Sequence, residues 1–298
     1  MNIPLQCNAE AAPSDGSTAI GYTDGSSPRQ TSVDLAPLTV FNSASLESQM
    51  VSRHLEDLGR SRGELSILEA GCGTAWPLKL PHLRYRLTGI DANEAALKAR
   101  QQNQGDLQHA ILGDLRTVEL NENEYDVIYN SFVLEHVASA ERVLENFRRW
   151  LAPGGILILR IPDPHSVYGW LSRVTPFWLH VAYKRYIAGY KNAGKPGYDP
   201  FPTVYDSVVS RAGIHRWCAA SGMTIRKEVG WNYAYSRAGL TQLASLGVRV
   251  VRLLSVGRLA SDHINLTYII EKTACGSPGG RTAQSRHDRA SEILNAAR

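Results

Sequence analysis

The feature that most constrains the fold is the alternation of short apolar runs with segments of helical pattern between residues 65 and 271. Apolar runs of about four to eight residues are typical of strands that are buried in a sheet. When such runs alternate with helices, the chain is expected to form βαβ units around a parallel sheet. Seven strands are predicted, at Leu65–Glu69, Arg86–Ile90, Leu107–Leu112, Tyr125–Asn130, Ile156–Ile161, Thr224–Val229 and Ile264–Glu271. The sequence therefore predicts an α/β fold with a doubly wound, seven-stranded sheet.

Two of the intervening helices have recognisable boundaries. The segment "NEAALKARQQN" begins at a candidate cap, Asn93, and is rich in helix-forming residues. The segment "ERVLENFRRWL" has one apolar face, made of Val143, Leu144, Phe147, Trp150 and Leu151. The Pro-Gly-Gly sequence at 153–155 is expected to end that second helix.

The two ends of the chain differ in composition from its middle. Residues 1–35 are rich in Ser, Gly, Asp, Thr and Pro, and residues 273–298 are similar, so both are expected to be disordered. Residues 36–272 are expected to form one domain with two insertions. The first, at about 162–205, is an aromatic-rich segment expected to form a helical cap. The second, at about 233–262, contains an apolar helix candidate.

The composition disfavours several classes of function. The net charge of +4 comes from dispersed basic residues, so nucleic acid is not expected as a partner. Four cysteines, Cys7, Cys72, Cys218 and Cys275, form no CxxC pair, and we expect free thiols and no metal site. There is no leader pattern and no apolar run of about 18 residues. We expect a cytoplasmic protein without an integral membrane span, and docking on a membrane surface stays open.

The stretch "ILEAGCGTAW" joins the first predicted strand to a glycine turn. A strand, a glycine turn and a helix N-terminus form a site where backbone N–H groups face a nucleotide-like ligand. The dinucleotide fingerprint G-x-G-x-x-G, begun at Gly71, needs a small residue at position 76, where this chain has Trp76. The tryptophan therefore disfavours a dinucleotide.

Acidic residues follow the first three strands. Glu69 ends the first strand, Asp91 ends the second, and Asp114 follows the third. A carboxylate at the position of Asp91 is suited to accept hydrogen bonds from both ribose hydroxyls. The alternative for Asp91 and Asp114 is that each only caps the following helix.

Five motifs in order resemble those of the class I S-adenosylmethionine-dependent methyltransferases: E-A-G-C-G-T from Glu69, G-I-D ending at Asp91, G-D at 113–114, "YDVIYNSFVLEHV" and "LAPGGILILRIPD". The chain looks like the small-molecule branch with the LEHV signature. The resemblance covers about residues 65–163 and the last strands only in outline. It implies a Rossmann-like methyltransferase sheet. Ala75 and Pro81 depart from the pattern, the latter by shortening the first helix.

The resemblance also implies roles for individual residues. Gly71 and Gly73 would lie close to the methionine part of S-adenosylmethionine, and Glu69 would hold its ammonium group. Asp91 would bind the ribose hydroxyls. Asp114 would bind the adenine amino group, and Asn130 would line the methionine end of the cofactor.

Methyl transfer to a hydroxyl requires a group that accepts the hydroxyl proton. His136 follows the fourth strand, and histidine is suited to accept a proton near neutral pH. Asp163 follows the fifth strand, and a carboxylate there is able to orient the imidazole. In several similar sugar and small-molecule O-methyltransferases a histidine and an acidic residue at such positions are thought to act together, and the resemblance implies the same for His136 and Asp163. The alternatives are a structural His136, which satisfies backbone groups, and His165 as the base.

The acceptor is expected to be a hydroxyl of a small or medium-sized molecule, with a saccharide or glycosylated metabolite as first choice. Aromatic side chains of the cap suit stacking on sugar rings, although they are equally suited to be the core of a helical subdomain. The stretches "WPL", "SVYG" and "KRY" resemble an actinobacterial subgroup of these enzymes, for which a methyltransferase of mycofactocin-type oligosaccharides is one specific candidate. A quinone or lipid methyltransferase at a membrane surface, and a cofactor-binding module without catalysis, are the alternatives.

Overall fold

The computed structural model describes residues 35–187, 189–195, 200–204, 206–232, 248, 250–256 and 258–273. The chain divides into two compact units, Met1–Ser32 and Val33–Arg298, and all described residues belong to the second. The expected disorder of the N-terminal segment and of the tail after Thr273 lies outside the described residues. So does the first part of the predicted apolar helix "GLTQLASLGVRVVRLLSVG", up to residue 247, whereas residues 248 and 250–254 are helical.

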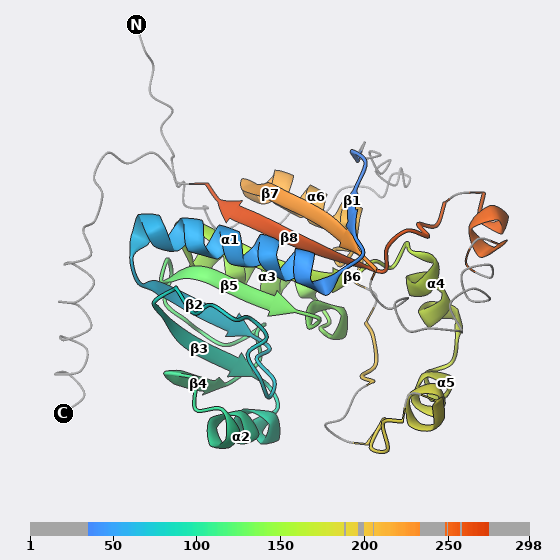
Figure 1. Cartoon of the computed structure of the whole chain (residues 1–298), viewed down its shortest axis with the longest axis horizontal. Coiled ribbons are helices and arrows are strands. Elements are labelled where there is room, and N and C mark those ends of the chain that lie inside the picture. Colours follow the sequence, from blue (N-terminus) through green and yellow to red (C-terminus); the bar gives the residue numbers. More distant parts are fainter. Residues whose placement is uncertain are drawn as a thin grey trace, which may run out of the picture. The chain divides into compact units, whose positions relative to one another are not determined.

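An eight-stranded mixed sheet forms the centre of the described unit (Figure 1). The spatial order is β1-β7-β8-β6-β5-β2-β3-β4. Its strands are β1 (Thr39–Phe41), β2 (Leu65–Ala70), β3 (Tyr85–Asp91), β4 (His109–Leu112), β5 (Tyr125–Ser131), β6 (Leu151–Pro162), β7 (Met223–Trp231) and β8 (Asn265–Lys272). All seven predicted strands are present, with ends that shift by up to five residues.

The sheet differs from the prediction in two respects. The short strand β1 pairs in parallel with β7 and adds an eighth strand at that edge. Strand β8 runs antiparallel to both β6 and β7, so the sheet is not wholly parallel. An apolar run indicates a buried strand but carries no information about its direction, which explains why the sequence did not reveal this reversal.

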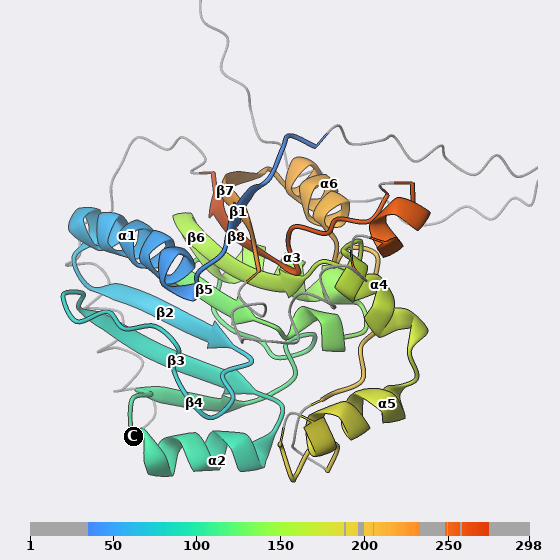
Figure 2. The same ribbon diagram turned by 45° about the vertical axis from the view of Figure 1, so that its right-hand side comes forward.

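Helices cover both faces of the sheet (Figures 1 and 2). Helix α1 (Ala44–Arg62) packs Met50, Val51 and Leu55 on one face, against side chains such as Ile67 and Val127. The other face is covered by α3 (Ala140–Trp150) and α6 (Arg211–Ser221). The apolar face predicted for "ERVLENFRRWL" is confirmed for Val143, Leu144, Phe147 and Trp150, which are buried on α3. Leu151 is buried too, but it begins β6, so the helix ends before the predicted stop at Pro153.

Residues 71–84, between β2 and β3, contain no helix, so the helix expected after the glycine turn is wrong. Pro77 and Pro81 lack the N–H that a helix interior needs. Trp76 instead packs edge-on against Tyr129, with ring centroids 5.2 Å apart, on the α1 face of the sheet. The bulk of this tryptophan therefore fills a layer where a helix would otherwise lie.

Helix α2 (Glu94–Asn103) is present where "NEAALKARQQN" predicted it. The Asn93 side chain caps it, since its Oδ1 accepts hydrogen bonds from the backbone N–H groups of Ala95 and Ala96. The cap segment is also helical. It contains α4 (Val167–Val174), α5 (Phe177–Ala182) and a π-helical turn η2 (Tyr183–Ile187).

The cap elements lie beyond the carboxyl ends of the strands, as both ribbon views show (Figures 1 and 2). Six of their seven aromatic residues from Tyr168 to Tyr190 are exposed. These aromatics therefore do not form the core of a helical subdomain, which removes one alternative from the sequence interpretation.

Candidate active site

The two glycines after β2 adopt conformations that other residues rarely adopt. Gly71 and Gly73 have φ angles of +76° and +52°. A Cβ at Gly71 would lie 2.3 Å from a methyl of Val133, whereas a Cβ at Gly73 would meet nothing within 4 Å. Gly71 thus lets the β2 and β5 loops approach each other. Gly73 leaves open space in which a ligand can reach the backbone.

Asp91 connects the glycine loop to helix α2. Its Oδ2 accepts a hydrogen bond from the Gly73 N–H, and its Oδ1 accepts one from the Asn93 N–H, both at 2.8 Å. A carboxylate has about four acceptor positions, so capacity for ribose hydroxyls remains. Asn93 is therefore the residue whose side chain caps α2, whereas the Asp91 carboxylate holds the glycine loop and the Asn93 backbone in place.

Glu69 is buried at the end of β2, and its Oε2 lies 2.7 Å from the Nη2 of Arg100. Burial raises the pKa of Glu69 to about 8 in spite of this arginine. The same guanidinium binds Asp106 through two nitrogens, at 3.0 and 2.9 Å, so its charge is shared between two carboxylates.

Arg100 was not identified from the sequence. It is fully buried, and its Nη1 donates a 2.6 Å hydrogen bond to the carbonyl of Cys72 within the glycine loop. The arginine therefore joins α2, β2 and the loop. In the sequence it appears as one of several charged residues on a helix that is mostly polar, which gave no signal of its burial.

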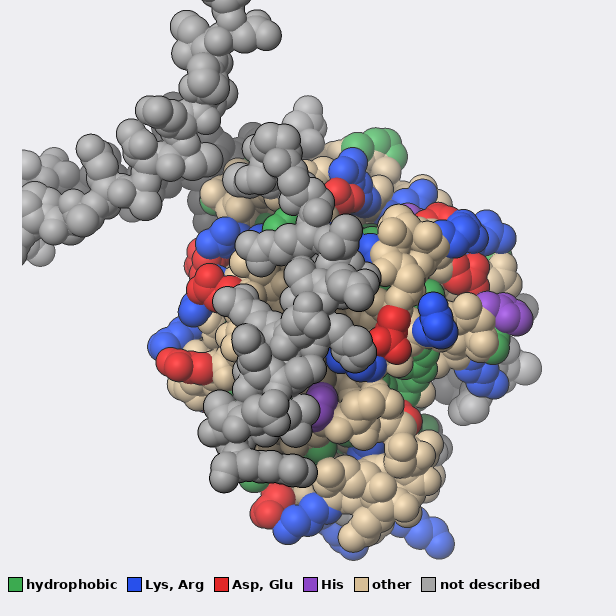
Figure 3. Space-filling model, turned by 90° about the vertical axis from the view of Figure 1, so that its left-hand side faces the viewer, with side chains coloured by type: hydrophobic (Ala, Val, Ile, Leu, Met, Phe, Trp, Pro, Cys, Tyr) green, Lys and Arg blue, Asp and Glu red, His purple; other side chains and the backbone are tan. Residues whose placement is uncertain are grey.

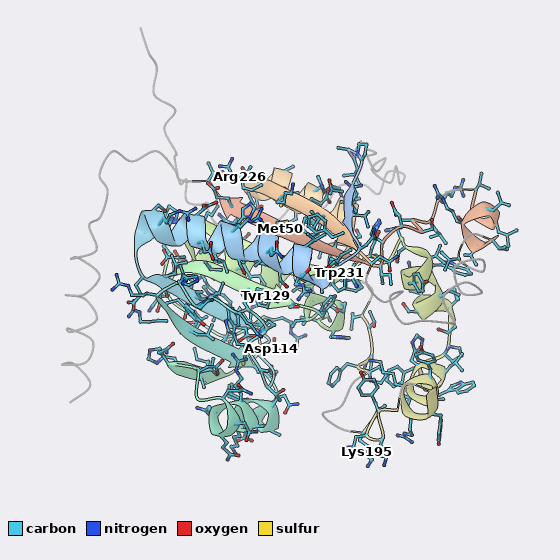
Figure 4. All side chains as sticks on the ribbon, viewed as in Figure 1. Met50, Asp114, Tyr129, Lys195, Arg226 and Trp231 are labelled. Atoms are coloured by element: carbon cyan, nitrogen blue, oxygen red, sulfur yellow. The ribbon has the colours of Figure 1, made fainter. Side chains whose placement is uncertain are left out.

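Asp114 lies after β4 at the carboxyl edge of the sheet (Figure 4). Its carboxylate is held by Arg116, with Nε 3.0 Å from both oxygens and Nη2 2.5 Å from Oδ2. These hydrogen bonds lower the pKa of Asp114. The side chain is ionised and partly exposed, so it is able to accept from a ligand amino group.

Asn130 is fully buried at the end of β5. Its Nδ2 donates a 2.8 Å hydrogen bond to the carbonyl of Ala70, and this contact fixes the orientation of the amide. Its Oδ1 has no hydrogen-bond partner among the described residues. A buried acceptor without a partner is unfavourable unless a ligand donates to it or carries positive charge near it.

His136 ends a short 3-10 turn, Leu134–His136, that follows β5. Its Nδ1 lies 2.8 Å from the carbonyl oxygen of Pro202, which can only accept a hydrogen bond, so Nδ1 carries the proton. Burial lowers the pKa of His136, and this carbonyl only partly offsets the effect. The imidazole is therefore neutral near pH 7, with a free electron pair on Nε2.

The structure does not pair Asp163 with His136. Asp163 is buried after β6, and its Oδ2 lies 2.9 Å from Nε2 of His263. The other imidazole nitrogen lies 2.9 Å from Oδ1 of Asp262. The predicted dyad is not formed, because His263, in the loop directly before β8, binds Asp163 instead. His165 is mostly exposed, and its backbone N–H donates to Asp163.

Glu135 is a second group that sequence reasoning did not select, although it lies within the LEHV signature. It is buried, its Oε1 is 3.9 Å from Nε2 of His136, and its Oε2 has no hydrogen-bond partner among the described residues. Burial raises the pKa of Glu135 to about 7. The carboxyl group adjacent to the imidazole is therefore Glu135.

The residues that the structure describes contain neither a metal-ligand cluster nor a membrane-spanning helix. No three His, Cys, Asp or Glu side chains in this part of the chain are arranged to hold a metal ion. Within the same residues, no helix combines the length and the apolar character needed to cross a bilayer.

Comparison with known proteins identifies the central part of the chain. Residues 68–159 match the family model described as a methyltransferase domain. The chain is 33% identical over 130 residues to the ubiquinone biosynthesis O-methyltransferase of Maricaulis maris, a match covering 37% of this chain and 50% of that protein. It is 25% identical to the malonyl-[acyl-carrier protein] O-methyltransferase of Serratia marcescens, over 49% of this chain and 56% of that protein.

The chain thus spans roughly half the length of these curated relatives. Among solved structures, a Listeria monocytogenes protein assigned as an S-adenosylmethionine dependent methyltransferase has a TM-score of 0.50 at 15% identity. The match covers 77% of this chain and 99% of that one. This likeness supports the fold, while the family model accounts for the motifs. Residues 68–159 therefore match a methyltransferase domain, and the solved structure supports the fold alone.

Proposed function

We propose that this chain transfers a methyl group from S-adenosylmethionine to a hydroxyl oxygen of a small or medium-sized acceptor. Our first choice of acceptor is a saccharide or glycosylated metabolite, such as a mycofactocin-type oligosaccharide. The observation that carries the proposal is the neutral imidazole of His136 at the carboxyl edge of the sheet. Among the described residues, Cys72 and Cys218 are buried free thiols, which suit a reducing compartment and support a cytoplasmic location.

The residues at this edge fit the cofactor. Open space at Gly73 admits a ligand to the backbone, and Asp91 keeps acceptor capacity for ribose hydroxyls. The free Oδ1 of Asn130 suits the positively charged methionine end, and Glu69 suits the ammonium group. We propose Glu69, Gly71, Gly73, Asp91, Asp114 and Asn130 as the cofactor-binding residues.

When bound, S-adenosylmethionine supplies a methyl group on a sulfonium. The chain must then orient the acceptor hydroxyl, exclude water and receive the hydroxyl proton. We assign the last task to Nε2 of His136, whose tautomer is fixed by Pro202. Glu135 is placed to stabilise the imidazolium that forms, a role that the sequence had suggested for Asp163. Asp163 instead anchors the β6 end through His263.

The exposed aromatic side chains of the cap support a saccharide acceptor, because aromatic faces stack on sugar rings and phenol groups bond to hydroxyls. The test is to incubate the purified chain and S-adenosylmethionine with an extract from cells that lack the protein. Adenosylhomocysteine formation and a product heavier by one methylene are expected. A matched acceptor whose hydroxyl is already methylated should give no turnover. Transfer to nitrogen, sulfur or carbon would contradict the proposal.

A second candidate is methylation of a quinone or lipid at a membrane surface. Two observations support it: the similarity to a ubiquinone biosynthesis enzyme and the exposed apolar side chains beyond the strands. A product that partitions into organic solvent would favour this candidate over the saccharide. Cofactor binding without any adenosylhomocysteine formation, across all acceptor classes, would indicate a module without catalysis.

A further inference from the structure

Large apolar side chains that are exposed are confined almost entirely to the two insertions. Of sixteen such residues in the described part of the chain, only Leu46 and Leu112 lie elsewhere. The other fourteen are Trp170, Val174, Phe177, Trp178, Leu179, Tyr183, Tyr186, Tyr190, Phe201, Val204, Val250, Leu253, Leu254 and Val256. We call this set the insertion surface. Exposed apolar groups gathered in one region usually mark an interaction site.

Positive charge is concentrated in the two insertions, although no stretch of them is a dense run of basic residues. Residues 164–198 contain no Asp or Glu and five Lys or Arg, and residues 229–261 contain no Asp or Glu and four Arg. The whole chain has 32 basic and 28 acidic residues, so the rest of it holds 23 basic against 28 acidic. Over the full insertions, 162–205 and 233–262, nine basic residues stand against three acidic ones, Asp163, Asp199 and Asp262, so the remainder of the chain is still net acidic, with 23 basic and 25 acidic residues.

The apolar and basic groups project from the same side of the molecule. Helices α4 and α5 and the segment at 250–256 all lie beyond the carboxyl ends of the strands (Figures 1 and 2). Lys195 lies at the outer end of the cap, far from Arg226 at the opposite end of the sheet (Figure 4). On the face turned away from the insertions, acidic and basic side chains are interspersed (Figure 3).

We propose that the insertion surface docks on the surface of an anionic lipid bilayer. Aromatic side chains such as Trp178 and Tyr186 suit the boundary between headgroups and acyl chains, while Leu253 and Leu254 suit the hydrocarbon below it. The basic residues supply attraction to anionic headgroups. Docking turns the carboxyl edge of the sheet, with the candidate active site, toward the membrane.

Two other occupants fit less well. A second copy of the chain would bring two net positive surfaces together in a symmetric interface, where like charges repel. Single-stranded nucleic acid would use the aromatic faces and the basic groups, but it offers no hydrocarbon for Leu253, Leu254 and Val256, all more than three-quarters exposed. A bilayer satisfies the aliphatic, aromatic and basic groups at once.

The experiment is co-sedimentation of the full chain with vesicles. Vesicles of equal parts phosphatidylglycerol and phosphatidylcholine should bind the chain at about 0.1 M salt, and pure phosphatidylcholine vesicles should bind it much more weakly. Two double variants test the two components, Trp178→Ser with Leu254→Ser and Lys191→Gln with Lys195→Gln. Each should lower the partition coefficient by about tenfold or more.

Matched controls separate docking from general loss of structure. Leu46→Ser with Leu112→Ser removes two apolar side chains outside the insertion surface that are about half exposed, and Lys98→Gln with Lys227→Gln removes two exposed charges. Both should keep vesicle binding within about twofold. Three results would each overturn the proposal. They are vesicle binding that does not depend on anionic lipid, a loss of vesicle binding in the control variants as large as in the test variants, and concentration-dependent dimers without vesicle binding. Calorimetry of S-adenosylmethionine binding reports on the cofactor site separately.

Discussion

The two halves of the sheet's carboxyl edge hold their polar groups through contacts of different range. On the β2–β4 side, Asp91 binds N–H groups 18 and two residues away, and Asp114 binds Arg116 two residues away. On the β5–β8 side, His136 binds a carbonyl 66 residues away, and Asp163 binds a histidine 100 residues away.

This difference separates the two tasks of the site. The half that we propose for the cofactor is organised mainly by contacts within residues 69–130, the segment that carries the motifs. The half that we propose for the acceptor depends on Pro202, near the end of the first insertion, and on His263, directly after the second. Insertions that vary in sequence are therefore able to change acceptor chemistry while cofactor binding is kept, and each half should respond separately to mutation.

The largest effect is expected from His136→Ala. Removing the proton acceptor should lower kcat about 1,000-fold and leave the S-adenosylmethionine Kd unchanged. Because burial lowers the pKa of His136, wild-type kcat/KM should rise on the acidic side of pH 6.5 and level off above it, and the variant should lose that rise. The matched control is His165→Ala, an exposed histidine. Near-wild-type turnover of His136→Ala between pH 6 and 8 would exclude the general base.

The next effect is on stability, in His263→Leu. This change leaves the buried Asp163 carboxylate without its imidazole partner and should cost about 3 kcal/mol in the free energy of unfolding. Burial opposes the charged imidazole, but its bonds to Asp163 and Asp262 raise its pKa. The stabilisation should therefore be complete below about pH 6.5 and decline as pH rises through the folded pKa. Urea unfolding at pH 6 and pH 9 checks this, and an equal loss at both would contradict it.

The sequence predicted the seven strands, both named helices and the crowding of acidic groups after β2, β3 and β4, because these depend on local patterns. It missed the antiparallel β8, the loss of a helix at Pro77 and Pro81, and the Asp163–His263 pair. Strand direction and the partner of a buried carboxylate depend on contacts across long stretches of chain, which periodicity does not record. Arg100 was missed for the same reason, since its burial depends on how α2 packs on the glycine loop.

A smaller effect is expected from Asp91→Ala. The variant loses the acceptor for the Gly73 and Asn93 N–H groups and the proposed ribose contact, so S-adenosylmethionine should bind about 100-fold more weakly. Unfolding of the free protein by urea should show how much of the loss comes from the loop itself. Calorimetry measures the affinity, and an unchanged Kd would exclude the ribose assignment. Vesicle binding depends on the insertion surface, and the Asp163–His263 pair lies on the β5–β8 side of the sheet, so the Asp91→Ala variant should keep both.

The smallest effect, and the one that tests the cofactor half in finest detail, is expected from Glu69→Gln. Burial raises the pKa of Glu69 to about 8 from its ordinary value of 4.5, so the free protein holds this carboxyl largely protonated at pH 7. An ammonium group beside it favours the ionised form, so binding of S-adenosylmethionine should release a proton, and affinity should rise between about pH 6 and 8. Calorimetry in two buffers of different ionisation enthalpy measures that proton. The Gln variant should bind about tenfold more weakly at pH 8 and release none. In the absence of ligand, the free energy of unfolding changes with pH in the opposite direction to the affinity. The pKa of Glu69 is higher in the folded than in the unfolded chain, so wild type should lose stability relative to the Gln variant as pH rises from about 5 to 8. If wild type binds without proton release, Glu69 is already ionised by Arg100, and the arginine rather than burial sets the charge at the end of β2.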